Sequence, residues 1–149
     1  MAANTYSFLN FTAAIIGPGG GFQLGSGEGA AEEGVSVSLS EEADRMVIGA
    51  DGTPMHSLNA SKAGRVTIRL LKTSLTNGRL SALYNFQRLS SVNWAQNTIL
   101  LTDVVRGDVY SCQSVAFTKF PDNKYGKDAN ILEWEFTAGI IDPLLAIVG

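Results

Sequence analysis

Apolar and polar residues alternate strictly in the middle of the chain, over residues 65–70 of the stretch 64–74. Three aliphatic side chains are interleaved there with basic and hydroxyl side chains: Val66, Ile68 and Leu70 with Arg65, Thr67 and Arg69. Because successive side chains of a strand point to opposite faces, this pattern predicts a β-strand with one apolar and one basic face. Such a strand belongs to a sheet that is buried on one side.

A helical pattern follows this strand. Leu80, Leu83 and Tyr84 recur at the spacing of one helical face, with Phe86 on its flank, and predict a helix over residues 76–89. Thr76 and Asn77 are residue types that cap a helix start, and we expect them to do so here. The helix would cover the apolar face of the preceding strand.

The rest of the chain favours further strands and only this one helix. Strands are expected at residues 6–16, 35–40, 98–102, 109–117 and 131–137, with a short return strand around Phe22 and Leu24. In the last of the long strands, Leu132, Trp134 and Phe136 would point inward, with Glu133 and Glu135 on the opposite face. The sequence therefore predicts a mainly β (α+β) fold, and 149 residues suit a single domain over residues 1–149.

Residues 41–63 are predicted to form a projecting arm. Asp51-Gly52 lies between two apolar stretches, which is the strongest hairpin signal in the sequence. Pro54 cannot donate a hydrogen bond to a sheet, so the second half of this hairpin is expected to be an edge strand or a loop. Connections of this length without a core of their own usually bind something.

The net charge of −3 hides a strong asymmetry along the chain. Residues 1–51 carry seven acidic side chains and one basic side chain, whereas residues 52–102 carry six basic side chains and no acidic one. Opposed blocks of this kind suit a head-to-tail contact between copies of the chain, which closes into rings or grows into filaments. Neutralisation of one block by the other within a single copy explains the pattern equally well.

The sequence offers little to catalysis or to metal binding. Cys112 and His56 are the only residues of their types, which excludes an internal disulfide, a four-cysteine metal site and a triad with two histidines. They could form a nucleophile and a base, but a lone cysteine in a strand is usually a small buried apolar residue. Glu133 and Glu135 would lie about 7 Å apart on one strand face, a spacing that suits a glycosidase, although such a face is commonly just solvated.

Two further motifs have ordinary explanations. The glycine-rich residues 17–29 contain no Gly-Lys followed by Ser or Thr, and an alternating strand follows where a nucleotide-binding motif needs a helix. Arg106-Gly107-Asp108 matches an adhesion tripeptide but also fits a turn between two strands. We therefore expect no enzyme activity, no cofactor and no metal.

The chain also lacks a secretion signal and any apolar run of about 18 residues, so we expect folding in a cytoplasm and no membrane contact.

Several segments, taken in order, resemble a known family. They are Gly17-Pro-Gly-Gly-Gly-Phe-Gln-Leu-Gly-Ser-Gly, Ala31-Glu-Glu-Gly, Met46-Val-Ile-Gly-Ala-Asp-Gly, Met55-His-Ser-Leu, Lys62-Ala-Gly, Val66-Thr-Ile-Arg-Leu-Leu-Lys-Thr-Ser, Tyr84, residues 87–91, Val115-Ala-Phe and Glu133-Trp-Glu-Phe. Together they cover almost the whole chain and resemble the tail tube proteins of contractile-tailed bacteriophages and prophages. The match carries no chemical signature.

The resemblance implies a β-barrel-like or β-sandwich-like subunit with one flanking helix. Such subunits form hexameric rings that close a continuous β-barrel around a lumen and stack into a tube, as in type VI secretion. The implied partners are further copies of the chain, the tail sheath protein, the tape-measure protein, and baseplate and tail-terminator proteins. DNA would pass through the lumen without specific binding, and the protein would act in the virion tail after assembly in the host bacterial cytoplasm.

Three sets of contact residues follow from combining this resemblance with the patterns above. Contacts between rings are expected on the arm, at Met46, Ile48, Asp51, Met55, His56 and Leu58. Charge-complementary contacts between subunits are expected at Glu41, Glu42, Arg65, Arg69 and Lys72. An acidic lumen face, which would keep a passing polyanion from sticking, is expected at Glu133 and Glu135.

Two other classes of function remain open at this stage. A small-ligand β-barrel carrier would need an enclosed apolar pocket within one subunit. A nucleic-acid binder would use Arg65, Arg69 and Lys72, but the acidic overall balance and the lack of interleaved exposed aromatic residues argue against it.

Overall fold

The computed structural model describes residues 11–25, 30–72, 75–103, 107–122, 125, 127 and 131–145. A single α-helix, α1 (Leu75–Arg88), and a short 3-10 helix at Ser91–Asn93 accompany the strands in this part of the chain. The strands are β1 (Phe11–Gly17), β2 (Gly20–Gly25), β3 (Ala30–Leu39), β4 (Asp44–Ile48), β5 (Pro54–Leu58), β6 (Gly64–Leu71), β7 (Asn97–Asp103), β8 (Asp108–Lys119) and β9 (Ile131–Leu144).

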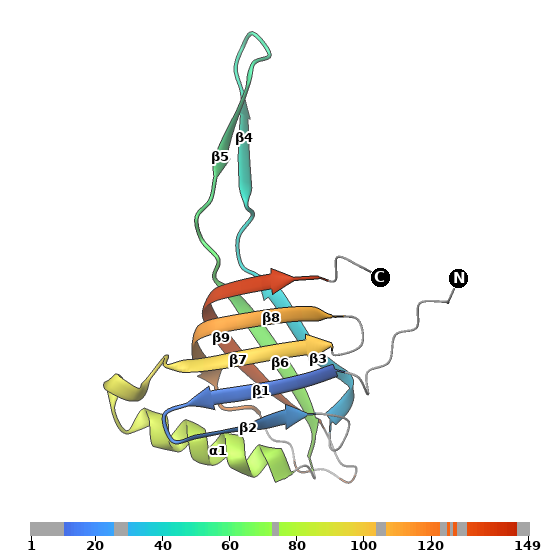
Figure 1. The fold of residues 1–149 in the computed structure, drawn as a ribbon, viewed down its shortest axis with the longest axis vertical. Coiled ribbons are helices and arrows are strands. Elements are labelled where there is room, and N and C mark those ends of the chain that lie inside the picture. The colour runs from blue at the N-terminus through green and yellow to red at the C-terminus, as the bar shows by residue number, and fades with distance from the viewer. Residues whose placement is uncertain are drawn as a thin grey trace, which may run out of the picture.

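Seven strands form one antiparallel sheet in the order β2-β1-β7-β8-β9-β6-β3, while β4 and β5 form a separate two-stranded arm. The sheet folds over on itself: β2, β1, β7 and β8 make one layer, and β6 and β3 cross behind it (Figure 1). The arm projects from one end of the two layers, and α1 lies across the opposite end (Figure 1). The predicted mainly β fold with one flanking helix is thus confirmed, and it takes the form of a half-barrel. That residues 1–149 make a single domain stays a prediction, and residues 6–10 of the expected first strand lie outside the described residues.

The alternation in β6 has the predicted structural effect. Val66, Ile68 and Leu70 are each at most 1% exposed and pack into the space between the layers. In β9, Leu132, Trp134 and Phe136 point into the same space, since they pair in register with the buried residues of β6. Phe117 of β8 completes this packing, with its ring centroid 5.9 Å from that of Trp134 and 4.9 Å from that of Phe136. The interior is therefore a filled core.

The sheet changes direction at one level of β8 and β9. The buried positions step by three residues there, from Cys112 to Val115 in β8 and from Ala138 to Ile141 in β9. Ser114 has a left-handed backbone conformation with φ of 53°, and the β7–β8 register shifts at the same level. An extra residue of this kind bends a strand and increases its twist. The part of the sheet on one side of this level can therefore turn away from the part on the other side.

The start of α1 differs from the prediction. The helix begins at Leu75, so Thr76 and Asn77 lie in its first turn and do not take the cap position. The Asn77 side chain instead donates to the carbonyl oxygen of Leu71 at 2.8 Å and accepts from the Trp134 indole N–H at 2.9 Å. It thereby ties the helix to the end of β6 and to β9, and satisfies the one polar group of a buried tryptophan.

Two buried amide side chains join the helix to the sheet. Gln87 and Asn97, both fully buried, exchange two hydrogen bonds of 2.7 and 2.8 Å. Gln87 also donates to the carbonyl oxygen of Pro18, and Asn97 donates to that of Val115, each at 3.1 Å. The pair thus connects α1, the β1–β2 turn, β7 and β8. Gly17 is required beside it, because a Cβ there would overlap the Asn97 carboxamide.

We predict that Asn97→Ala strongly destabilises the subunit. The substitution removes the donor to the buried Gln87 side-chain oxygen and the side-chain donor to the Val115 carbonyl, while the Gln87 amino group keeps its bond to Pro18. Each buried group that loses its partner costs about 1–3 kcal/mol. The free energy of unfolding, measured in urea under conditions that keep the protein unassembled, should fall by about 2–4 kcal/mol. Asn85→Ala, on the exposed face of the same helix, is the matched control and should change it by less than about 0.5 kcal/mol. Equal effects from the two substitutions would contradict the structural role given to Asn97.

Cys112 lies in the core of β8 and has no exposed surface. Burial disfavours the thiolate and raises the pKa of the Cys112 thiol to about 11. The thiol therefore stays protonated at neutral pH, which makes it a poor nucleophile.

The raised pKa of Cys112 predicts a loss of stability at alkaline pH. A thiol whose pKa is higher in the folded state stabilises the fold fully below its unfolded pKa, and this contribution is lost as the pH rises toward the folded value. Between about pH 9 and 11 the loss should reach at most about 1.4 kcal/mol per pH unit. Tyrosine and lysine side chains also titrate in this range. Comparing the urea unfolding of wild type with that of Cys112→Ala separates the contribution of the Cys112 thiol from theirs. Parallel pH curves for the two proteins would contradict the prediction.

Candidate functional site

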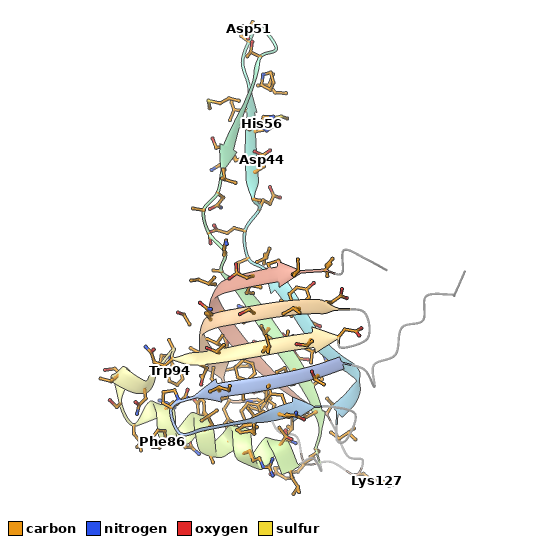
Figure 2. The ribbon with its side chains drawn as sticks, in the orientation of Figure 1. Asp44, Asp51, His56, Phe86, Trp94 and Lys127 are labelled. Carbon is orange, nitrogen blue, oxygen red and sulfur yellow. The ribbon has the colours of Figure 1, made fainter. Side chains whose placement is uncertain are left out.

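The arm is the most exposed part of the described chain. β4 and β5 pair from Asp44 opposite Leu58 to Ile48 opposite Pro54. At the tip, Asp51 Oδ1 accepts a hydrogen bond from the Thr53 N–H at 3.0 Å, and Gly52 takes a left-handed conformation with φ of 88°. The bond from Thr53 lowers the pKa of the Asp51 carboxyl, so the tip is negatively charged at neutral pH. The predicted hairpin at Asp51-Gly52 is observed, and Figure 2 shows Asp51 at its far end.

Both faces of the arm carry apolar side chains in contact with solvent. Every residue of β4 and β5 is exposed, with Leu58 at 87% and Ile48 at 60%. Since residues opposite one another share a face, Met46 and Ile48 lie on one face, and Val47 and Met55 on the other. An isolated two-stranded hairpin is at best marginally stable in water. Apolar residues on both faces are therefore available for contact with other molecules on two sides of the arm.

The inter-ring residues predicted from the sequence all lie on this arm. His56 and Asp44 share a face and are joined by a contact of 2.9 Å between Nδ1 and Oδ2 (Figure 2). Val47 was missed, although the alternation from Met46 to Ile48 places it on the opposite face. Whether these side chains make contacts between rings stays a prediction.

The root of the arm is tied to the sheet. The Ser40 N–H donates to the Ala63 carbonyl oxygen at 2.9 Å, and the Asn59 side chain donates to Glu41 Oε2 at 2.8 Å. Lys62 makes two contacts with β9: its carbonyl oxygen accepts from the Ile141 N–H at 2.8 Å, and its ammonium lies 3.0 Å from Asp142 Oδ1. These bonds fix the direction in which the arm leaves the sheet.

The charged residues predicted to join subunits are divided between two places. Glu41 and Glu42 lie at the arm root, whereas Arg65 and Arg69 lie on the outward face of β6. Glu133 and Glu135 face outward on the neighbouring strand, directly opposite Arg69 and Thr67. Arg65 and Arg69, predicted for a subunit contact, therefore share one sheet face with Glu133 and Glu135, predicted for the lumen.

Glu133 has a charge partner that was not evident from the sequence. Arg69 Nε lies 3.3 Å from Glu133 Oε2, and Arg69 Nη1 donates to Ser36 Oγ at 3.0 Å. The cross-strand register, which the sequence alone does not give, brings these residues together. Lys72 lies over the Tyr125 ring at 3.9 Å from its centroid. Arg69 and Lys72 thus have partners within the same chain.

Two edge strands bound the sheet, and the unpaired side of each edge strand is called an open margin below. In the described part of the chain, β2 and β3 each pair with a neighbour on one side only. The second half of β9 would be a third margin, but its Ile141 N–H is already bonded to Lys62. Pro143, two residues further on the same side, has no N–H to offer. Unpaired margins are templates for strand addition, and this third one is blocked.

The structure does not bring together the two candidate catalytic residues, His56 and Cys112. His56 lies on the arm and Cys112 in the core, so they form no nucleophile and base pair. Across the residues that the structure describes, no three His, Cys, Asp or Glu side chains cluster in a way that could hold a metal ion. No helix within those ranges has the length and apolar character needed to cross a membrane.

Solved structures share this fold. A chain in the 6-fold symmetrised baseplate of the anti-feeding prophage superposes with a TM-score of 0.61, at 13% identity over 99% of this chain and 100% of that one. A chain of that prophage's tube terminating cap gives 0.59, at 12% identity over 98% and 96%. A chain of the extracellular contractile injection system PVC, from a sheath-tube complex in the extended state, gives 0.52 at 12% identity over 91% and 88%.

Sequence comparison places the chain in a family. A search of curated proteins found no match. The profile of the bacteriophage PhiTE tail tube protein matches residues 2–146, which is nearly the whole chain. That family consists of structural proteins and not of enzymes, as the sequence led us to expect. The chain therefore belongs to the PhiTE tail tube protein family, among the tube proteins of contractile tail-like systems.

Proposed function

We propose that this chain is the subunit of a bacteriophage tail inner tube, in which hexameric rings stack around a lumen that conducts DNA. The observation that carries the proposal is the pair of open margins at β2 and β3 of one sheet. Two different margins on one molecule suit a heterologous contact, in which β2 of one copy pairs with β3 of the next. Such contacts close into a ring when the rotation from one copy to the next fits into a full turn a whole number of times. The 6-fold symmetrised assembly that contains a similar fold supports six copies.

The arm is proposed to hold successive rings together. Its length carries it clear of the two layers along the long axis of the subunit (Figure 1). Burial of its exposed apolar side chains against another ring would supply the free energy for stacking. The contributing residues are Met46, Val47, Ile48, Met55 and Leu58, together with Asp51 and His56.

Charge contributes in this proposal through residues that have no partner among the described residues. Glu42 at the arm root and Arg65 on β6 are exposed, and neither has an ion pair within the described residues. They can therefore join copies, with Glu41 as a neighbour. Arg69 and Lys72 contribute less, because each already has a partner nearby.

The remaining partners are proposed from the assemblies in which similar folds are found. Those assemblies are a sheath-tube complex, a baseplate and a sheath/tube terminator. We propose equivalent contacts here with a tail sheath, a baseplate and a terminator protein, and a tape-measure protein within the lumen. Glu133 and Glu135 are proposed to face that lumen. Since Arg69 neutralises Glu133, Glu135 would contribute most to repelling DNA. The site of action is then the virion tail, after assembly in the host cytoplasm.

The carrier function considered above is not favoured. A carrier needs an enclosed apolar pocket, and the aromatic side chains of Phe117, Trp134 and Phe136 fill the space between the layers. Family membership also argues against this function.

We predict that removing the arm separates ring formation from stacking. Ala43 and Asn59 are joined by a hydrogen bond of 2.8 Å, so residues 44–58 can be replaced by Asn-Gly without straining the root. The shortened protein should unfold at nearly the wild-type temperature, since the arm contributes nothing to the core. Negative-stain electron microscopy should show rings without tubes. Tubes of normal length from this protein would contradict the role of the arm.

Point variants test the same contact with the hairpin retained. Met46→Ser with Ile48→Ser should change the free energy of unfolding by less than about 1 kcal/mol in total, because both side chains are exposed in the subunit. Tube mass recovered by sedimentation should nevertheless fall at least about tenfold, a change that a loss of about 1.4 kcal/mol at the contact would produce. Ser57→Ala, on the same arm, is the control and should leave the tube mass unchanged.

A further inference from the structure

A groove lies at the end of the subunit opposite to the arm. It runs between α1 and the β1–β2 turn, has a volume of about 540 Å³, and is lined by residues 19–21 with Phe22, Arg79, Leu83 and Phe86. This volume is within the range of roughly 300–1,000 Å³ that is usual for binding sites. Figure 2 places Phe86 at this end of the molecule and Asp51 at the far end of the arm.

Three consecutive glycines leave one wall of the groove without side chains. A Cβ at Gly20 would meet nothing within 4 Å, so this wall is open to an approaching backbone. Gly19 has a φ of 101°, and a Cβ there would overlap the Phe86 ring. The glycines therefore allow the β1–β2 turn to pack against α1 while keeping the groove open.

The charge in the groove is basic and comes from Arg79. Arg79 lies on the exposed side of α1, and its guanidinium makes no hydrogen bond or ion pair with any residue that the structure describes. Leu83 and Phe86 supply apolar surface next to it. The groove thus combines one cation that has no partner among the described residues, the apolar side chains of Phe22, Leu83 and Phe86, and an accessible backbone wall.

The tip of the arm has the complementary features. Gly49, Ala50 and Gly52 make it thin, and Ile48 and Met55 provide apolar side chains that are 60% and 59% exposed. Asp51 is the only charged residue of the tip, and its carboxylate has one oxygen engaged by the Thr53 N–H. A thin, apolar tip with one negative charge matches a glycine-walled, apolar groove with one positive charge.

We infer that the tip of the arm docks into the groove of a second copy of this chain in the next ring, with Asp51 facing Arg79. This inference deepens the proposed tube function and rests on it. Because tip and groove lie at opposite ends of one subunit, the contact repeats indefinitely in one direction. It also fixes the polarity of the stack, since neither two tips nor two grooves fit each other.

Charge exchange tests this contact directly. In Arg79→Glu, the groove repels the acidic tip, and in Asp51→Lys the tip repels the basic groove. The protein concentration needed for tubes, measured by sedimentation at 0.15 M salt, should rise about tenfold or more in each single variant. Combining Asp51→Lys with Arg79→Glu should lower it again toward the wild-type value. Arg88→Glu makes the same charge change on the same helix outside the groove, and should leave the concentration unchanged.

A second variant separates charge from turn structure. Asp51→Asn keeps the acceptor for the Thr53 N–H but removes the negative charge, so it should weaken stacking while the hairpin remains formed. Single variants that stack like wild type, or a double variant that fails to recover, would overturn the docking inference and leave the tube function intact. A wild-type protein that forms neither rings nor tubes at any concentration would overturn the tube function itself.

Discussion

Strand β9 is the constraint on which the structure depends, because it is the one element that pairs with both layers. Residues 131–138 follow β6 and residues 135–144 follow β8, so both layers are defined by the path of this single strand. The step in the buried positions near Ser114 and Gly139 sets where the path bends. The buried pair of Gln87 and Asn97 then fixes α1 against the folded sheet. The open margins, the arm root and the groove all derive their positions from this arrangement.

Much of the fold could be predicted from local pattern. A period of two marks β6 and the first half of β9, since one face of each is buried, and the helical spacing of Leu80 and Leu83 marks α1. Asp51-Gly52 marks the hairpin because few residues tolerate its backbone conformation. These features depend on neighbours in sequence, so the sequence is sufficient to locate them.

The parts that could not be predicted depend on register and on distant contacts. The Arg69 and Glu133 ion pair needs the alignment of β6 with β9, which no local signal encodes. Asn77 resembles a cap in sequence but bonds instead to Leu71 and Trp134, because tertiary partners outcompete the helix end. Gln87 looks like a surface residue of an amphipathic helix and is buried, since Asn97 satisfies its amide. Pro143 did carry a readable signal, as a proline within a strand favours an edge.

The blocked second half of β9 has a consequence for how assembly stops. In the proposed ring, β2 of one copy pairs with β3 of the next, and Pro143 and the Lys62 bond leave the second half of β9 unsuited to a third contact of this kind. Within the described part of the chain, each copy would then offer two margins for strand pairing. Strand pairing between such units gives closed or linear products and does not branch, and only the arm would add a second direction of growth. A copy that can pair at only one of its two margins would then end the growing row of subunits. A small fraction of such defective subunits would leave many incomplete rings. The uniformity of the subunit pool, and not only its concentration, would therefore limit the yield of complete rings.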